Sequence, residues 1–156
     1  MSKTAAKPHL SEAEEQCKLM AWAEYCVWAG VYPELALLFA IPNGGKRNAA
    51  EAAHLKRQGV KAGVPDLCLA VPRGAYHGLY IELKVGTNKP TENQLAWLKL
   101  LKQHGYAVAV CYSAEEAKDV IDKYLNQKEK KKRYGIDFYR LHSSRRRNRF
   151  FNGNTV

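Results

Sequence analysis

Three polar residues in the middle of the chain, Asp66, Glu82 and Lys84, are of types that could together hydrolyse a phosphodiester. Two carboxylates that lie close together repel each other unless a cation sits between them, and hard oxygen ligands suit Mg²⁺ or Mn²⁺. An ammonium group beside them can hold a water molecule or stabilise charge on a phosphoryl oxygen. The sequence therefore predicts a metal site for the attack of water on a phosphodiester, provided that these side chains meet.

The runs that contain these residues read as two strands. Asp66 begins DLCLAV, and the other two residues lie in GLYIELKV. A tight hairpin between the runs would bring Asp66 towards Glu82. The second run alternates, so Glu82 and Lys84 share one face and the leucines and isoleucine share the other. An ordinary half-exposed strand also carries Glu and Lys two residues apart. Asp66, a poor strand former directly after Pro65, is what favours a site here.

The remaining elements can be read from periodicity and capping signals. The S-x-x-E form of Ser11–Glu14 and the T-x-x-Q form of Thr91–Gln94 are capping boxes that open helices. We expect helices over about 11–29, 49–58, 91–105 and 113–126, and strands over 35–42, 66–71, 78–85 and 106–112. This order predicts one mixed α/β domain with helices packed on a central sheet.

The charge of the chain is concentrated near its C-terminal end. Residues 128–149 hold ten of the 25 basic residues and two of the 15 acidic ones, a local charge of +8, whereas the rest carries only +2. A basic arm with interleaved aromatic residues suits a nucleic-acid backbone, and a solvated tail that aids solubility is an equally good interpretation. Candidate DNA-binding residues are Lys130, Lys131, Lys132, Arg133, Arg145, Arg146 and Arg147, with Lys46 and Arg47 in the loop after the first strand.

Composition excludes several classes of protein. The longest apolar run, LALLFAI, is far too short to span a membrane, and the first residues do not resemble a signal peptide, so we expect a cytoplasmic protein. The four cysteines are scattered among apolar residues without a C-x-x-C pair, which favours buried, reduced thiols over disulfides or a zinc site.

The pattern Pro65-Asp66 … Glu82-Leu83-Lys84 resembles that of the PD-(D/E)xK nuclease superfamily. More narrowly, residues 11–126 resemble the VRR-NUC (virus-type replication-repair nuclease) family in its stand-alone phage and bacterial form. The resemblance includes Glu15-Gln16 in the first helix, the segments AGVPDL and YIELK, and Gln94 followed three residues later by Trp97. It implies a restriction-endonuclease-like αβββαβ core over 11–126, with 35–41 as first strand. The charge distribution and the loss of periodicity beyond about Gln127 make 127–156 a basic extension.

The resemblance also implies roles for individual residues. Asp66 and Glu82 would bind the metal together with the main-chain carbonyl of Leu83, and Lys84 would position the nucleophilic water. The acid of the first helix, a further catalytic residue and metal ligand, maps best to Glu15, with Glu12 and Glu14 as alternatives, although Glu14 already belongs to a capping box. Gln94 would lie near the active centre, yet its capping box explains its presence equally well.

The function that follows as an expectation is a Mg²⁺- or Mn²⁺-dependent DNA endonuclease. Family resemblance suggests branched DNA, such as four-way junctions or flaps, and a homodimer, which suits a symmetric junction. The alternatives are an inactive nucleic-acid-binding protein on the same fold, a sequence-specific restriction-type nuclease and a junction resolvase from a neighbouring branch. The complete set of Asp66, Glu82 and Lys84 argues against the first alternative, and the small body leaves little room for the recognition region that the second would need.

Overall fold

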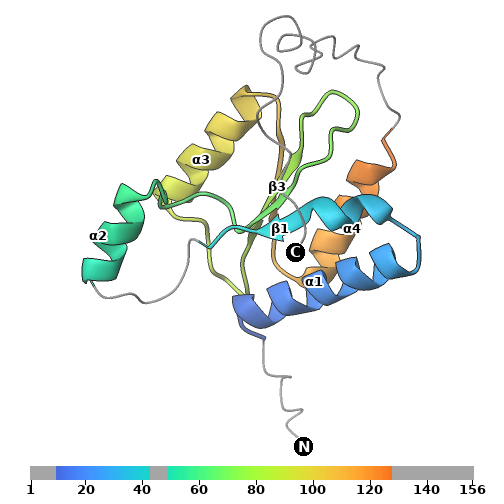
Figure 1. Cartoon of the computed structure of the whole chain (residues 1–156), viewed down its shortest axis with the longest axis horizontal. Helices are drawn as coiled ribbons and strands as arrows, with labels where there is room; N and C mark the ends of the chain where they lie inside the picture. The colour runs from blue at the N-terminus through green and yellow to red at the C-terminus, as the bar shows by residue number, and fades with distance from the viewer. Residues whose placement is uncertain (1–9, 43–48, 128–156) are drawn as a thin grey trace, which may run out of the picture.

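The computed structural model describes residues 10–42 and 49–127, which form one sheet with helices on both faces (Figure 1). The sheet has the order β1-β2-β3-β4, in which the first three strands are antiparallel and β3 and β4 are parallel. The strands are β1 Leu38–Ala40, β2 Leu67–Leu69, β3 Leu79–Leu83 and β4 Ala107–Cys111. The helices are α1 Glu12–Trp28, α2 Ala49–Arg57, α3 Glu92–Gln103 and α4 Ala114–Leu125, with a 3-10 helix η1 over Pro33–Leu37. The predicted mixed α/β architecture is confirmed.

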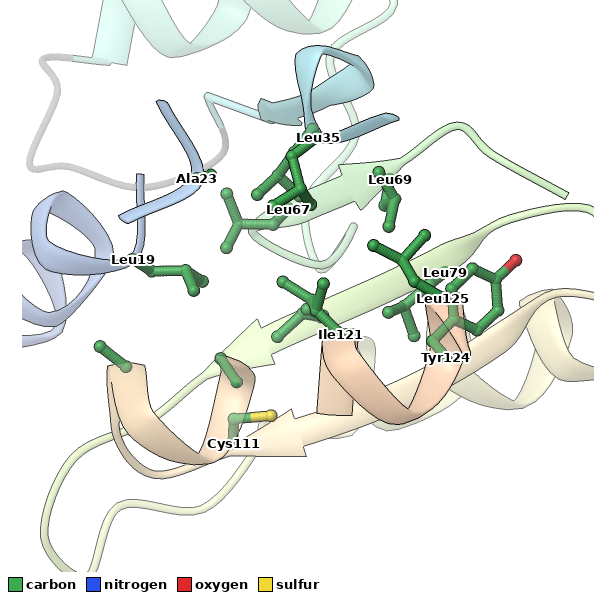
Figure 2. Close-up of a cluster of buried hydrophobic side chains, with 14 of the residues drawn as sticks. Leu19, Ala23, Leu35, Leu67, Leu69, Leu79, Cys111, Ile121, Tyr124 and Leu125 are labelled. Carbon is green, nitrogen blue, oxygen red and sulfur yellow. The ribbon is translucent and has the colours of Figure 1, made fainter. Parts of the chain in front are cut away.

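The hydrophobic core lies between one face of the sheet and the pair α1 and α4. Figure 2 shows leucines of β2 and β3 pointing at side chains from these two helices and from η1. On β3 the alternate residues Leu79, Ile81 and Leu83 are buried in this core, as the period of two predicts. The intervening residues, Tyr80 and Glu82, therefore point to the opposite face, on the side of α3.

The hairpin of β2 and β3 sets the register that matters for the site. Leu67 pairs with Ile81 and Leu69 pairs with Leu79 in antiparallel orientation. One step beyond the first of these pairs, Asp66 lies across from Glu82, on the face away from the core. The expected hairpin is thus present, and its register brings the two acidic residues together.

The prediction of a strand over 35–42 was wrong in its first half, where the chain forms η1. Pro33 occupies the first turn of this helix, where a missing N–H costs nothing. Leu35 in η1 and Leu38, the first residue of β1, are three residues apart and both buried against the core, so the apolar run keeps a helical spacing up to the start of β1. A short apolar run does not distinguish strand from helix by periodicity.

The helix α3 lies across the sheet from α1 and α4 (Figure 1). Its buried residues Leu98 and Leu101 face inward, and the indole Nε1 of Trp97 donates to the carbonyl of Ala62 at 3.1 Å. After β3 the chain runs to the start of α1 and then turns back into α3 (Figure 1), where Asn88 Nδ2 donates to Glu12 Oε1 at 3.3 Å. The beginnings of α1 and α3 therefore flank the carboxyl end of β3.

Two expectations from composition can be compared with the described residues. No helix among them is long and apolar enough to cross a membrane. All four cysteines are free, and Cys26, Cys68 and Cys111 are buried as expected. The expectation was wrong for Cys17, which is exposed on α1 because that helix turns this position away from the sheet.

Candidate active site

Glu82 is the most deeply buried charged residue of the site, with 0% of its surface exposed. Its Oε1 accepts hydrogen bonds from the Nζ of Lys84, at 2.6 Å, and from the Nε2 of Gln94. Its Oε2 is buried and has no hydrogen-bond partner among the described residues. Burial raises the pKa of Glu82, the Lys84 ammonium opposes this rise, and the negative charge of Asp66 adds to it. The fold thus holds a carboxylate with one oxygen fixed and the other unsatisfied.

Asp66 is fixed from the neighbouring strand. Its Oδ2 accepts a hydrogen bond from the main-chain N–H of Leu83 at 2.8 Å, one residue beyond Glu82. Burial raises the pKa of Asp66, while the bond from Leu83 and the charge of Lys84 pull it down. The two acidic side chains therefore share a partly desolvated space, in which burial outweighs the attraction of Lys84 and leaves both pKa values raised.

Lys84 follows the last residue of β3 and is 7% exposed. Its main-chain N–H donates to the carbonyl of Cys111 at 2.8 Å, so the parallel pairing with β4 extends to this residue. Its Nζ contacts Glu82, donates to the carbonyl of Leu83 at 3.0 Å and lies 3.8 Å from Glu12 Oε2. Burial acts to lower the pKa of Lys84, but the surrounding carboxylates outweigh burial and the pKa is raised. Lys84 is therefore an ammonium group at neutral pH.

The first helix presents Glu12 to the site. Glu12 Oε2 approaches Lys84, and its charge contributes to the raised pKa values of Asp66 and Glu82. Glu15, which the sequence favoured, is placed elsewhere: its Oε2 accepts a hydrogen bond from the N–H of Ala114, at 2.7 Å, in the first turn of α4. Glu14 closes the capping box with Ser11, as expected. Of the three acids weighed from the sequence, Glu12 is the one in contact with Lys84.

Gln94 performs both tasks that the sequence left open. Its Oε1 accepts from the N–H of Thr91 at 2.8 Å, which completes the capping box of α3. Its Nε2 donates to Glu82 at the same time. The start of α3 is thereby tied directly to the acidic centre.

The residues present fit a hard divalent cation. Asp66, Glu82 and the carbonyl of Leu83 offer the oxygen donors that Mg²⁺ and Mn²⁺ prefer. The unpaired Oε2 of Glu82 is the observation that supports such a ligand, because a buried carboxylate oxygen without a partner is costly. Within residues 10–42 and 49–127, no cluster of three or more His, Cys, Asp or Glu side chains is arranged to hold a metal. The oxygen atoms that could bind such a cation here are those of two carboxylates and one peptide group.

Several residues predicted to bind DNA lie outside the described residues. This holds for Lys46 and Arg47, which lie between β1 and α2 in the sequence, and for the whole basic set of the C-terminal extension. That set comprises Lys130, Lys131, Lys132, Arg133, Arg145, Arg146 and Arg147. Their contribution to binding stays a prediction.

Two residues of the site were not assigned to it from the sequence. Thr91 was identified only as a helix cap, and Asn88, which contacts Glu12, gave no signal because it lies in an irregular loop. The T-x-x-Q pattern could have pointed to Thr91, because the capping box that contains Gln94 also places Thr91 next to it. Asn88 could be found only from the tertiary contact.

The chain is similar to a family of known proteins and to solved structures. A family model described as "VRR-NUC domain" matches residues 6–115. A solved structure described as "VRR_NUC domain protein" is 33% identical to this chain, with a TM-score of 0.66, and the match covers 78% of this chain and 93% of that chain. No curated protein matches the chain.

Proposed function

Because this chain belongs to the VRR-NUC family, a family of nucleases, we propose that it is a divalent-metal-dependent DNA endonuclease that is selective for branched DNA. The observation that carries the proposal is the grouping of Asp66, Glu82 and Lys84 at the end of β3, with the Oε2 of Glu82 buried and unpaired. An ordinary core has no reason to bury such a carboxylate. The grouping is explained if a ligand completes the site.

We assign Asp66, Glu82 and the carbonyl of Leu83 to the metal. When bound, Mg²⁺ or Mn²⁺ would supply a Lewis acid for a phosphoryl oxygen. Lys84 would hold the attacking water or stabilise charge that develops on the scissile phosphate, because its ammonium is buried beside both carboxylates. Glu12 would orient Lys84 from the start of α1 and would be the acid of the first helix, a position for which the resemblance favoured Glu15.

Two finer parts of the proposal concern the substrate and the assembly. The basic extension would bind the DNA backbone without reading bases, so that the shape of the DNA rather than its sequence directs cleavage. A homodimer would present two equivalent sites to the two strands of a four-way junction. Both parts rest on charge in the sequence and on family resemblance.

The test compares the wild-type protein with Asp66→Ala and Lys84→Ala on labelled four-way junctions, flaps and plain duplex, in Mg²⁺, Mn²⁺ or EDTA. We expect cleavage of branched DNA that EDTA abolishes and that each substitution slows by at least about 10²-fold. Binding of the same DNA, measured by fluorescence anisotropy, should survive. Glu115→Gln, at an exposed residue of α4 paired with Lys118, is the control and should cleave like the wild type.

The rival functions predict different results. A wild-type protein that binds junctions tightly but cuts none of these substrates in either metal would be an inactive nucleic-acid-binding protein. Cleavage of plain duplex at one short sequence, with no preference for branches, would identify a restriction-type enzyme instead. Activity that persists in EDTA would contradict the metal assignment.

A further inference from the structure

The N-terminal cap of α3 is joined to the acidic centre through one glutamine side chain. Thr91 and Gln94 make three hydrogen bonds with each other. The Oε1 of Gln94 accepts from the N–H of Thr91 at 2.8 Å and from its Oγ1 at 3.1 Å, and the N–H of Gln94 donates to Oγ1 at 3.4 Å. Thr91 therefore holds the glutamine side chain at its carbonyl end.

This arrangement fixes which way the amide group of Gln94 points. A main-chain N–H can only donate, so the atom of Gln94 that faces Thr91 must be the oxygen. The amide nitrogen then has to face Glu82, to which it donates. The opposite orientation would set two donors against each other at Thr91 and two oxygens against each other at Glu82.

The orientation of Gln94 decides which oxygen of Glu82 remains available. Gln94 and Lys84 both donate to Oε1, and Oε2 is left buried without a partner among the described residues. If the amide of Gln94 turned away, only Lys84 would still hold the carboxylate of Glu82 at Oε1. The hydrogen bonds that cap α3 are thus connected, through Gln94, to those that hold Glu82 by Oε1 and leave its Oε2 unpaired.

We propose that Thr91 is a positioning residue for the metal site, which acts through Gln94 to hold the Oε2 of Glu82 ready for the cation. This inference rests on the proposed function, because it assigns Glu82 to the metal. Outer partners of metal ligands typically contribute 10- to 100-fold in affinity. Thr91 lies one hydrogen bond further out than Gln94, so we expect an effect of about tenfold, at the lower end of this range.

The test measures binding of Mn²⁺ alone to the full-length protein by isothermal titration calorimetry, together with the melting temperature. Thr91→Val keeps the main-chain N–H that orients Gln94 but removes the hydroxyl that also donates to the Oε1 of Gln94 and caps the helix, and we expect Mn²⁺ affinity to fall about tenfold. Thr91→Ser restores the hydroxyl and should restore wild-type affinity. The control is Ser113→Ala, which removes the equivalent cap of α4, where Ser113 Oγ accepts from the N–H of Glu116 at 3.1 Å. It should lower the melting temperature as Thr91→Val does and leave Mn²⁺ affinity unchanged.

Thr91→Asp separates capping from positioning and serves if Thr91→Val does not fold. Aspartate is a good N-cap, so the helix start is kept, but its carboxylate repels the Oε1 of Gln94 and cannot donate to it. The added charge by itself would tighten Mn²⁺ binding, whereas displacement of Gln94 and Glu82 would weaken it. Weaker binding therefore supports the inference, and binding equal to or tighter than that of the wild type overturns it.

The outcomes also separate this inference from the proposed function. If the wild type binds Mn²⁺ and cuts junctions while Thr91→Val matches Ser113→Ala in affinity, Thr91 is only a helix cap and this inference fails alone. If the wild type neither binds Mn²⁺ nor cuts DNA, the proposed function fails and this inference fails with it.

Discussion

At the scale of single residues, two glutamates one turn apart on α1 have different tasks. Glu12 contacts Lys84 and Asn88 at the end of β3. Glu15 accepts from the N–H of Ala114, where the N-terminal end of α4 favours a negative charge. The first contact belongs to the candidate site and the second ties α1 to α4. One residue should therefore affect cleavage and the other stability.

We predict that Glu12→Gln slows cleavage by about 10- to 100-fold and changes stability little. Glu15→Gln should lower the free energy of unfolding by about 1 kcal/mol and leave cleavage at saturating Mg²⁺ unchanged, because it removes only the charge at the start of α4. Urea denaturation and single-turnover cleavage of a junction measure the two effects. The reverse pattern would return Glu15 to the role that the sequence favoured.

At the scale of elements, α3 is held close to the segment that leads into β2. Gly63 has a φ of +86°, and a Cβ at this position would meet the main-chain carbon of Asn93, in the first turn of α3, at 2.7 Å. Only glycine tolerates both the dihedral angle and this approach. Since Gln94 follows Asn93, the same contact positions the glutamine that bonds Glu82.

Gly63→Ala should therefore weaken both the fold and the site. We expect the free energy of unfolding to fall by about 3 kcal/mol and Mn²⁺ binding to weaken, because α3 must move away from the segment that carries Asp66 into β2. Gly59→Ala is the matched control: its φ is +94°, but no atom lies within 4 Å of the added Cβ. Gly59→Ala should lower the free energy of unfolding only by the backbone strain, about 1–2 kcal/mol, and should leave the affinity for Mn²⁺ unchanged. Equal effects of the two substitutions on Mn²⁺ binding would show that the approach of α3 is not needed by the site.

At the scale of the whole molecule, the positive charge and the candidate site lie in different parts of the sequence. The site is built from residues 12–94, whereas residues 128–149 carry the local charge of +8. Contacts between cations and phosphates release counterions and make binding steeply dependent on salt. Affinity for DNA and the cleavage step should therefore respond to different substitutions.

We predict that replacing Arg145, Arg146 and Arg147 by glutamine weakens binding to every DNA structure. The slope of the logarithm of affinity against the logarithm of salt should fall by up to about 3 units, one for each phosphate that is no longer neutralised. The control replaces Lys102 and Lys123, near the C-terminal ends of α3 and α4, and should leave the slope unchanged. Fluorescence anisotropy titrations at several salt concentrations measure this slope. If the arginine replacements changed only which substrate is cut, the extension would determine specificity.

Much of the fold was predictable because its signals are local. The alternation in β3 and the capping boxes at Ser11 and Thr91 depend on neighbouring residues, and the structure contains each of these features. The segment 35–42 was the exception, since a short run that is apolar throughout has no period to separate a 3-10 helix from a strand.

The order of residue types along the chain was enough to predict which polar residues come together in the candidate site: two acids and a lysine on a hairpin, with a glutamine opening the next helix. It could not predict that Glu12 rather than Glu15 contacts Lys84, or that Thr91 and Gln94 leave the Oε2 of Glu82 unpaired; the folded arrangement was needed for both. Periodicity sets which face of an element a side chain occupies. The docking of α1 against α4, and of α3 against the sheet, sets which atoms on that face come within hydrogen-bonding distance.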